Sequence, residues 1–204
     1  MAAGRERDKD KMTNLEISLH PGPKALTAAA MMAGFSPSKT FPAVTDACGV
    51  LWHEPTELQI AVALTGGEAS GNAWCYHINS DAGKSVDFGI MEINGEAHKE
   101  YFGGYSAMAP LAWNWMNYLD NMRAAHDIYL KDGWKPWNAY TGGGYLALRY
   151  DSPVHGSHSW MTWAQHGIAQ AQAAVKAYQL LGKLPAAALA LVASVNCDPL
   201  ELSS

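Results

Sequence analysis

Residues 56–72 read TELQIAVALTGGEASGN, and this stretch decides how the rest of the chain is interpreted. Thr56 and Gln59 have the spacing of a capping box, and apolar side chains then recur at helical spacing over residues 58–65. Two glycines end the apolar pattern immediately before Glu68, and a polar stretch follows. The sequence therefore predicts an apolar helix that places a carboxyl group at its end, beside a loop.

Further helices are predicted on both sides of this one. Residues 25–34 are rich in helix formers and end on a glycine. Apolar side chains at helical spacing mark another helix over residues 116–128, with Asp120 as a cap for part of it and Gly133 as its end. A last helix is expected over residues 159–181.

The β signal is much weaker. Residues 69–85 are polar and show no helical period, and we interpret them as a loop. Residues 86–94 follow as a short strand or hairpin, the only convincing β signal in the chain. The expected fold class is therefore α+β, mainly helical, with a small β element.

The composition fits one compact domain and excludes several classes of function. With 204 residues, 49% of them hydrophobic, the chain can bury one substantial core. A net charge of -5, without a run of Lys and Arg, excludes a nucleic-acid-binding module. Three cysteines cannot form a closed set of disulfides and lack the spacing of a zinc site, so we expect free thiols and no metal or organic cofactor.

Composition also divides the chain into three parts. Residues 1–24 are highly charged, lack the pattern of a secretory signal and end near Pro21-Gly22-Pro23, which is typical of a flexible tail. Residues 25–150 are expected to form the main domain. Residues 151–204 are expected to be a helical extension that packs on this domain or on a partner, and their longest apolar run, residues 186–195, is too short to span a membrane.

Two acidic residues indicate a chemistry. Glu68 at a helix end can be half-buried, and burial raises the pKa of a carboxyl group so that it can act as a general acid near neutral pH. Asp87 lies 19 residues further on, at the start of the β element, where a returning loop can face it across a cleft. Glycoside cleavage uses such a pair of carboxyl groups, one protonated and one ionised. On spacing alone, however, a solvated glutamate at a helix end is the more common case.

Three segments together resemble a known family. They are GEASGN at residues 67–72, SVDFGIMEIN at 85–94 and NMRAAHDIYLKDGWKPWNAYTGGGY at 121–145. Their order and spacing are similar to those of the lysozyme and lytic transglycosylase superfamily, and most similar to the lysozyme-like domains of phage tail and tape-measure proteins. The strong match covers residues 56–147, with a weaker match at residues 31–35. The resemblance implies a lysozyme-like fold with its small β element beside an active-site cleft.

The resemblance also implies roles for individual residues. Glu68 matches the catalytic acid of the family, and Asp87, in the run DFGI, matches the second carboxylate of animal-type lysozymes. Trp137 and Tyr140 match the aromatic segment that lines the cleft, and the tyrosine helps to orient the acid in the transglycosylase branch.

Three further positions are expected to bind the glycan. Gly89 would let the backbone come close to a sugar, and Asn94 offers donors and an acceptor to N-acetyl groups. Trp134 is a further aromatic candidate for the cleft, although without the resemblance Trp134, Trp137 and Tyr140 would be interpreted as ordinary core.

The sequence departs from the family pattern in three ways. Glu92 stands where the family usually has glutamine, which brings a negative charge near the expected site. This charge would raise the pKa of Glu68 or weaken glycan binding. Ala69 follows Glu68 where a serine is usual, so the orientation of the acid is less well defined. The disulfide framework of animal-type lysozymes is absent, so stability must come from the core or from a partner.

The carboxyl pair favours a glycosidase, and the resemblance implies that it cleaves peptidoglycan, as a muramidase that cuts the bond between N-acetylmuramic acid and N-acetylglucosamine. Alternatives are a lytic transglycosylase that forms 1,6-anhydro products and a non-catalytic virion or wall-binding module that keeps the fold. A zinc endopeptidase built on His155 and His158 lacks a third ligand at recognisable spacing.

The resemblance also implies partners and a location. We expect the chain to act on peptidoglycan glycan strands and to contact other phage virion proteins, without a nucleic acid or a membrane span. It would be found in the phage tail, or in the host cytoplasm before release.

Overall fold

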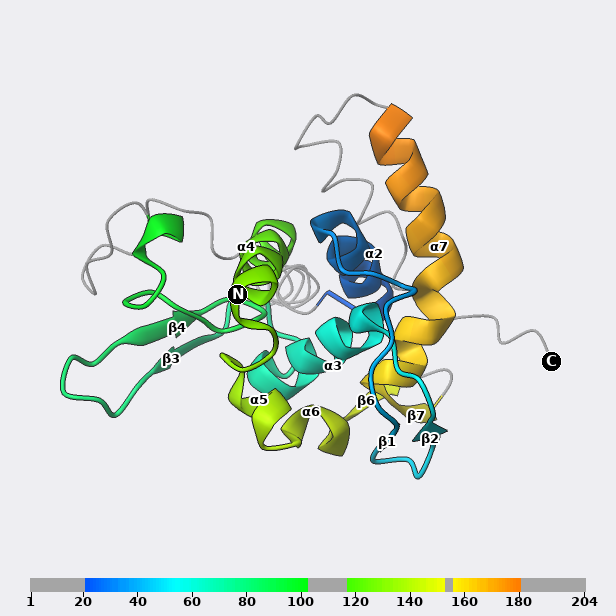
Figure 1. The fold of residues 1–204 in the computed structure, drawn as a ribbon, viewed down its shortest axis with the longest axis horizontal. Coiled ribbons are helices and arrows are strands. Elements are labelled where there is room, and N and C mark those ends of the chain that lie inside the picture. Colours follow the sequence, from blue (N-terminus) through cyan, green and yellow to red (C-terminus); the bar gives the residue numbers. More distant parts are fainter. Residues whose placement is uncertain (1–20, 103–116, 153–155, 181–204) are drawn as a thin grey trace, which may run out of the picture.

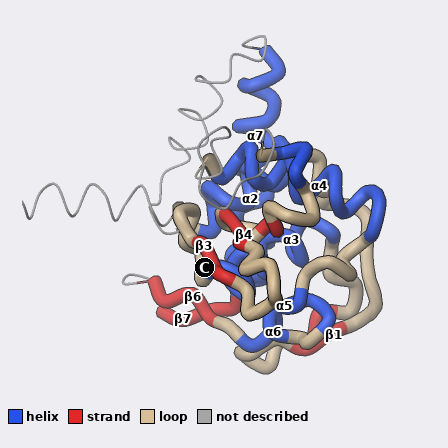
Figure 2. The backbone as a smooth tube through the Cα atoms, turned by 90° about the vertical axis from the view of Figure 1, so that its left-hand side faces the viewer, coloured by secondary structure: helices blue, strands red, loops and turns tan. Residues whose placement is uncertain are grey.

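The computed structural model describes residues 21–102, 117–152 and 156–180. Within these ranges the chain has an α+β fold, about 48% helical and 16% strand, so the predicted α+β class is confirmed. Helices form the body of the molecule, and three small antiparallel sheets lie toward its edges (Figure 1). Figure 2 views the molecule from the side on which β3 (Tyr76–Ile78) and β4 (Val86–Phe88) project.

The central element is helix α3, which runs from Glu57 to Ala69. The predicted capping box at its start is confirmed, because the Thr56 and Gln59 side chains each bond the other's backbone N–H. Eleven of its thirteen residues are buried, so α3 is covered on all sides rather than on one face. The helix ends at Ala69, one residue past the expected end, and Glu68 lies in its last turn as predicted.

Helices α2 (Pro23–Ala33) and α7 (Trp160–Leu180) pack against α3, and α4 (Tyr118–Asp132) packs against α2. Helix α2 packs against all three of the others. The expectation that residues 21–24 belong to an unpacked tail is wrong, because they are buried and Pro23 starts α2, where a proline costs no hydrogen bond. The cap of α4 is Asn117, not Asp120 as predicted, since the Asn117 side chain accepts the N–H groups of the first turn.

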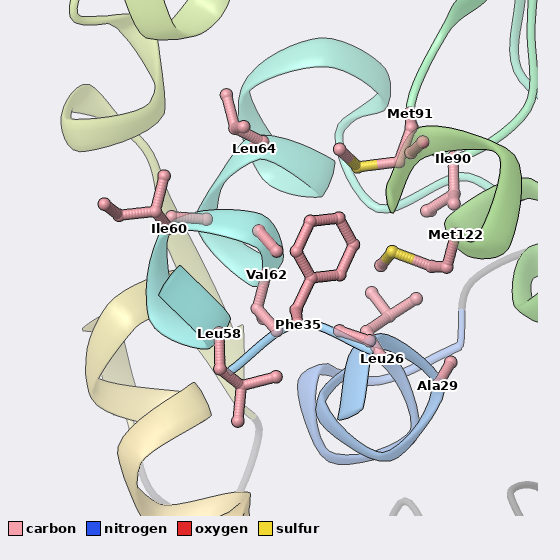
Figure 3. Packing of buried hydrophobic residues seen from close by; sticks show 14 of the residues in the cluster. Leu26, Ala29, Phe35, Leu58, Ile60, Val62, Leu64, Ile90, Met91 and Met122 are labelled. Carbon is pink, nitrogen blue, oxygen red and sulfur yellow. The ribbon is translucent and has the colours of Figure 1, made fainter. Parts of the chain in front are cut away.

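Phe35 lies at the centre of the core (Figure 3). Its ring is 1% exposed and is surrounded by Leu26, Val62 and Met122, which come from three different helices. Burying a side chain of this size contributes about 1.5–3 kcal/mol. The core therefore joins α2, α3 and α4 into one unit.

The sheet beside α4 has three strands in the order β3-β4-β5, with β5 at Ile93–Asn94. The expected β element at residues 86–94 thus supplies β4 and β5, but the polar stretch before it also contains a strand, so its interpretation as a loop is wrong. Strand β3 is exposed at every position and has only three residues, too few for an alternating pattern to mark it in the sequence. Its register pairs His77 with Asp87.

Two further hairpins were missed in the sequence. They are β1 (Val44–Thr45) with β2 (Leu51–Trp52), and β6 (Arg149–Ser152) with β7 (Gly156–Ser159). Strands of two to four residues are too short to show a period of two. The remaining elements are α5 (Asn138–Thr141), α6 (Gly144–Ala147) and a 3-10 turn at Lys99–Tyr101.

Several expectations fall on residues outside the described ranges. These are the tail at residues 1–20, Met116, His155, the end of the last helix at 181–182, the apolar run at 186–195 and Cys197. Within the described residues, Cys48 and Cys75 are free thiols. No helix in the described part of the chain has the length and apolar character needed to cross a membrane.

Candidate active site

A cavity of about 390 Å³ opens where the end of α3 and the start of α5 approach the β3–β5 sheet. Its walls are polar and rich in carboxyl groups. The residues that line it are Glu68, Asn79, Ser80, Asp81, Ser85, Asp87, Glu92, Ile93, Asn94, His98, Ile128, Pro136, Trp137 and Asn138. The volume lies within the range of pockets that bind small ligands.

Two glycines let neighbouring elements come close to the end of α3. A Cβ atom at Gly66 would lie 2.4 Å from Nε1 of Trp160, and one at Gly67 would lie 2.8 Å from Cβ of Ala139. Both distances are shorter than the contacts that real Cβ atoms make. Because α5 can therefore pack directly on α3, the Ala139 backbone N–H donates a 2.8 Å hydrogen bond to Oε1 of Glu68.

The surroundings of Glu68 favour its protonated form. Burial raises the pKa of this carboxyl group, the hydrogen bond from the Ala139 N–H lowers it, and the nearby carboxylates of Glu92 and Asp87 raise it again. The net result is a pKa above the ordinary value of 4.5. A carboxyl group that keeps its proton closer to neutral pH is suited to general acid catalysis.

A hydrogen-bond network orders the sheet wall of the cavity. The Asn94 amide donates to Oδ1 of Asp87 at 2.6 Å and to Oγ of Ser85 at 3.1 Å. The Ser85 hydroxyl in turn donates to Oδ2 of Asp81. Because Asp87 and Asn94 are partners in the β4–β5 register, this network holds the Asp87 carboxylate in one orientation.

The turn between β4 and β5 is fixed from behind by two side chains. Asn121 of α4 is fully buried, accepts the Met91 N–H at 2.9 Å and donates to the Phe88 carbonyl at 3.0 Å. The Trp137 indole N–H donates to the Met91 carbonyl at 2.9 Å. The turn that carries Glu92 is therefore tied to both α4 and the start of α5.

The structure brings four of the seven predicted site residues together around the cavity, namely Glu68, Asp87, Asn94 and Trp137. The other three do not line it. Gly89 adopts a left-handed backbone with φ of 79° and shapes the β4–β5 turn.

Trp134 and Tyr140 belong to an aromatic cluster behind the cavity wall. The Trp134 ring is 4% exposed and stacks on Phe35 with 5.5 Å between the ring centroids. Tyr140 stacks on Tyr145 and lies 5.9 Å from Trp134. Trp134 and Tyr140 therefore pack in the core, the alternative that their residue types left open.

Several residues of the cavity were missed in the sequence. Asn79, Asp81 and Ser85 lie in the polar stretch that we interpreted as a loop. Asn121 does not line the cavity but supports its β4–β5 turn, and its signal was overlooked: an asparagine on the apolar face of a helix needs buried hydrogen-bond partners.

The charge of the cavity limits its ligands. Among the described residues that line it, four are acidic and none is Lys or Arg. An anionic ligand would be repelled, whereas a neutral ligand rich in hydroxyl and amide groups can use the available donors and acceptors. In the described part of the chain, no group of three or more His, Cys, Asp and Glu is arranged to hold a metal ion.

Comparisons with known proteins add nothing to the site: no family model, no curated protein and no solved structure matches this chain.

Proposed function

We propose that this chain is a lysozyme-like muramidase that cleaves the bond between N-acetylmuramic acid and N-acetylglucosamine in peptidoglycan, with Glu68 as the general acid. The observation that carries the proposal is the position of Glu68, half-buried and facing a cavity that it shares with Asp87. Two carboxyl groups in unlike surroundings are the pattern that glycoside hydrolysis needs. The sequence resemblance supports the same assignment.

The cavity chemistry fits a glycan. The amide groups of Asn79, Asn94 and Asn138 can exchange hydrogen bonds with sugar hydroxyl and N-acetyl groups. Trp137 adds an apolar surface to the same wall. Because the lining is acidic, we expect binding to depend on these neutral groups rather than on charge attraction.

In the proposed reaction, the Glu68 carboxyl group gives its proton to the glycosidic oxygen as the bond from this oxygen to the anomeric carbon breaks. The Asp87 carboxylate stabilises the positive charge that develops on the sugar ring, or attacks it, and water completes the hydrolysis. General acid catalysis of this kind contributes about 10²–10⁴-fold to the rate.

We also propose a setting for this activity. The resemblance to phage tail and tape-measure domains favours a role in the virion, where the chain would open the bacterial wall and contact other virion proteins.

The test is digestion of purified peptidoglycan, with the released fragments identified by mass spectrometry. The proposal predicts muropeptides with reducing ends. Fragments with 1,6-anhydro ends would instead identify a lytic transglycosylase. Binding to peptidoglycan without any release of fragments would identify a wall-binding module and would overturn the proposal.

A further inference from the structure

We propose that Glu92 is a further catalytic residue of this cavity, the general base that takes a proton from the attacking water. The inference rests on the proposed glycosidase function and deepens it, because it assigns the step that follows protonation by Glu68. It is carried by the backbone of the turn that holds Glu92, by the buried contacts behind that turn, and by the small number of partners around its carboxylate.

The backbone at Glu92 is unusual for a residue with a side chain. Its φ is 43°, in the left-handed region that favours glycine. Its N–H donates to the Gly89 carbonyl at 3.0 Å, which closes the turn between β4 and β5. Strained positions of this kind persist only where the surrounding structure imposes them, and they cluster at functional sites.

Buried contacts impose this backbone. Ile90 and Met91, the two residues before Glu92, are fully buried and anchor the turn in the core. Asn121 and Trp137 hold the Met91 backbone N–H and carbonyl from behind. With its neighbours fixed in this way, the turn presents Glu92 to the cavity that Glu68 lines.

The Glu92 carboxylate is left almost without partners. Within the described residues its one hydrogen bond comes from the Cys75 thiol, 3.1 Å from Oε1, and no Lys or Arg pairs with it there. The buried carboxylate of Glu57 differs, because it is bound by Lys39, Tyr129 and the Ser36 N–H. A thiol is a weak donor, so the remaining lone pairs of Glu92 stay open to the cavity.

The electrostatic surroundings support a role as a base. Burial raises the pKa of Glu92, the Cys75 hydrogen bond lowers it, the nearby carboxylate of Asp87 raises it, and His77 on β3 lowers it, with a net increase. Glu92 and Glu68 also repel each other across the cavity. The pKa of Cys75 is raised to about 12, so its thiol remains a hydrogen donor at every pH of interest.

The step balances without any other reactant. Water adds its oxygen to the anomeric carbon, its proton passes to the Glu92 carboxylate, and the glycosidic C–O bond breaks as Glu68 protonates the leaving oxygen. Asp87 then acts only by stabilising positive charge. Because this is a single displacement on a β-linked glycan, the first product must be the α anomer.

The experiment compares the wild type with Glu92→Gln on solubilised peptidoglycan strands, with Glu96→Gln as a matched surface control. We expect Glu92→Gln to lower kcat by about 10²–10⁴-fold, with KM nearly unchanged. The acidic limb of the pH–rate profile should disappear in this variant, because that limb reports ionisation of the base. NMR of the wild-type reaction should show the α anomer first.

Three results would overturn the inference while the proposed function survives. The first is a wild type that yields the β anomer first, and the second is a Glu92→Gln variant that keeps its kcat. The third is a Glu92→Gln variant in which only the alkaline limb of the pH–rate profile moves to lower pH, as expected if Glu92 merely raises the pKa of Glu68. A wild type that releases no reducing ends overturns both proposals. Thermal unfolding of both variants confirms that any loss of activity occurs in folded protein.

A second pair of variants tests the Cys75 hydrogen bond. Cys75→Ser keeps a donor to Glu92 and should retain most of the activity. Cys75→Ala removes the donor that lowers the pKa of Glu92, so its acidic limb should move to higher pH. An identical pH profile for the two variants would contradict a positioning role for this thiol.

Discussion

Replacement of Gly67 by alanine tests how the fold positions Glu68, the proposed catalytic acid. Gly67 lies in the last turn of α3, immediately before Glu68. A Cβ atom there would lie 2.8 Å from Cβ of Ala139, 3.0 Å from Cα of Tyr145 and 3.2 Å from its backbone nitrogen. Because two of these three atoms are backbone, no side-chain rotation can relieve the contact, and α5 and α6 must move away.

The size of the effect follows from two opposing contributions. Overpacking of this kind costs about 1–3 kcal/mol. Alanine in place of glycine in a helix interior gains up to about 1 kcal/mol. We therefore expect a net loss of about 1 kcal/mol, which lowers Tm by about 2–4 °C in a protein of this size. The shift of α5 should also weaken the bond from the Ala139 N–H, so the pKa of Glu68 should rise further.

Urea unfolding measures the first effect, and an NMR titration of the Glu68 carboxyl carbon measures the second. Gly144→Ala is the matched control, because a Cβ atom there would make ordinary contacts at 3.6 Å or more. It should change stability by less than about 0.5 kcal/mol. If Gly67→Ala is as stable as the wild type and leaves the titration of Glu68 unchanged, the close approach of α3 and α5 does not set the properties of the acid.

Three other substitutions test the site and its support. The pKa of Glu68 is raised in the fold, so its ionisation at neutral pH costs stability. Glu68→Gln should therefore raise Tm at pH 7, and calorimetry should show that this gain shrinks below pH 4.5, where Glu68 is protonated in both states. Asn121→Ala removes the partner of the Met91 N–H and the Phe88 carbonyl, so urea unfolding should show a free energy of unfolding lower by about 2–5 kcal/mol. A loss below about 1 kcal/mol would contradict the role of this side chain in the β4–β5 turn. Asp46 accepts hydrogen bonds from Ser159, Trp52 and two backbone N–H groups, and together these outweigh the effect of burial and lower its pKa. Asp46→Ala should lower the free energy of unfolding by at least about 3 kcal/mol at pH 7, and this loss should diminish only as the pH falls below 3.8 and through the lowered pKa.

The sequence was most informative where local chemistry determines structure. The capping box at Thr56 and Gln59 needs only four consecutive residues, and it was predicted correctly. Gly133 ends α4 as expected, because only a residue without a Cβ atom readily adopts its φ of 64°. Glu68 was placed at the end of a helix by the same local patterns.

The sequence was least informative where distant segments determine structure. Strand β3 is exposed on both faces and exists because β4 pairs with it, so its own residues do not mark it. Trp134 is an aromatic residue near the site motif, yet packing against Phe35 places it in the core. The hydrogen bond between Cys75 and Glu92 joins two segments that a single sequence does not relate.

The central claim is that Glu68 supplies the proton for glycan cleavage. The most direct test measures the rate at which the wild type and Glu68→Gln release reducing ends from peptidoglycan. Glu54→Gln provides a control for an exposed glutamate close to the start of α3. The account predicts release by the wild type and by the control, and a loss of at least about 10²-fold in Glu68→Gln while the protein remains folded and bound to the wall. Equal rates for the wild type and Glu68→Gln would contradict it.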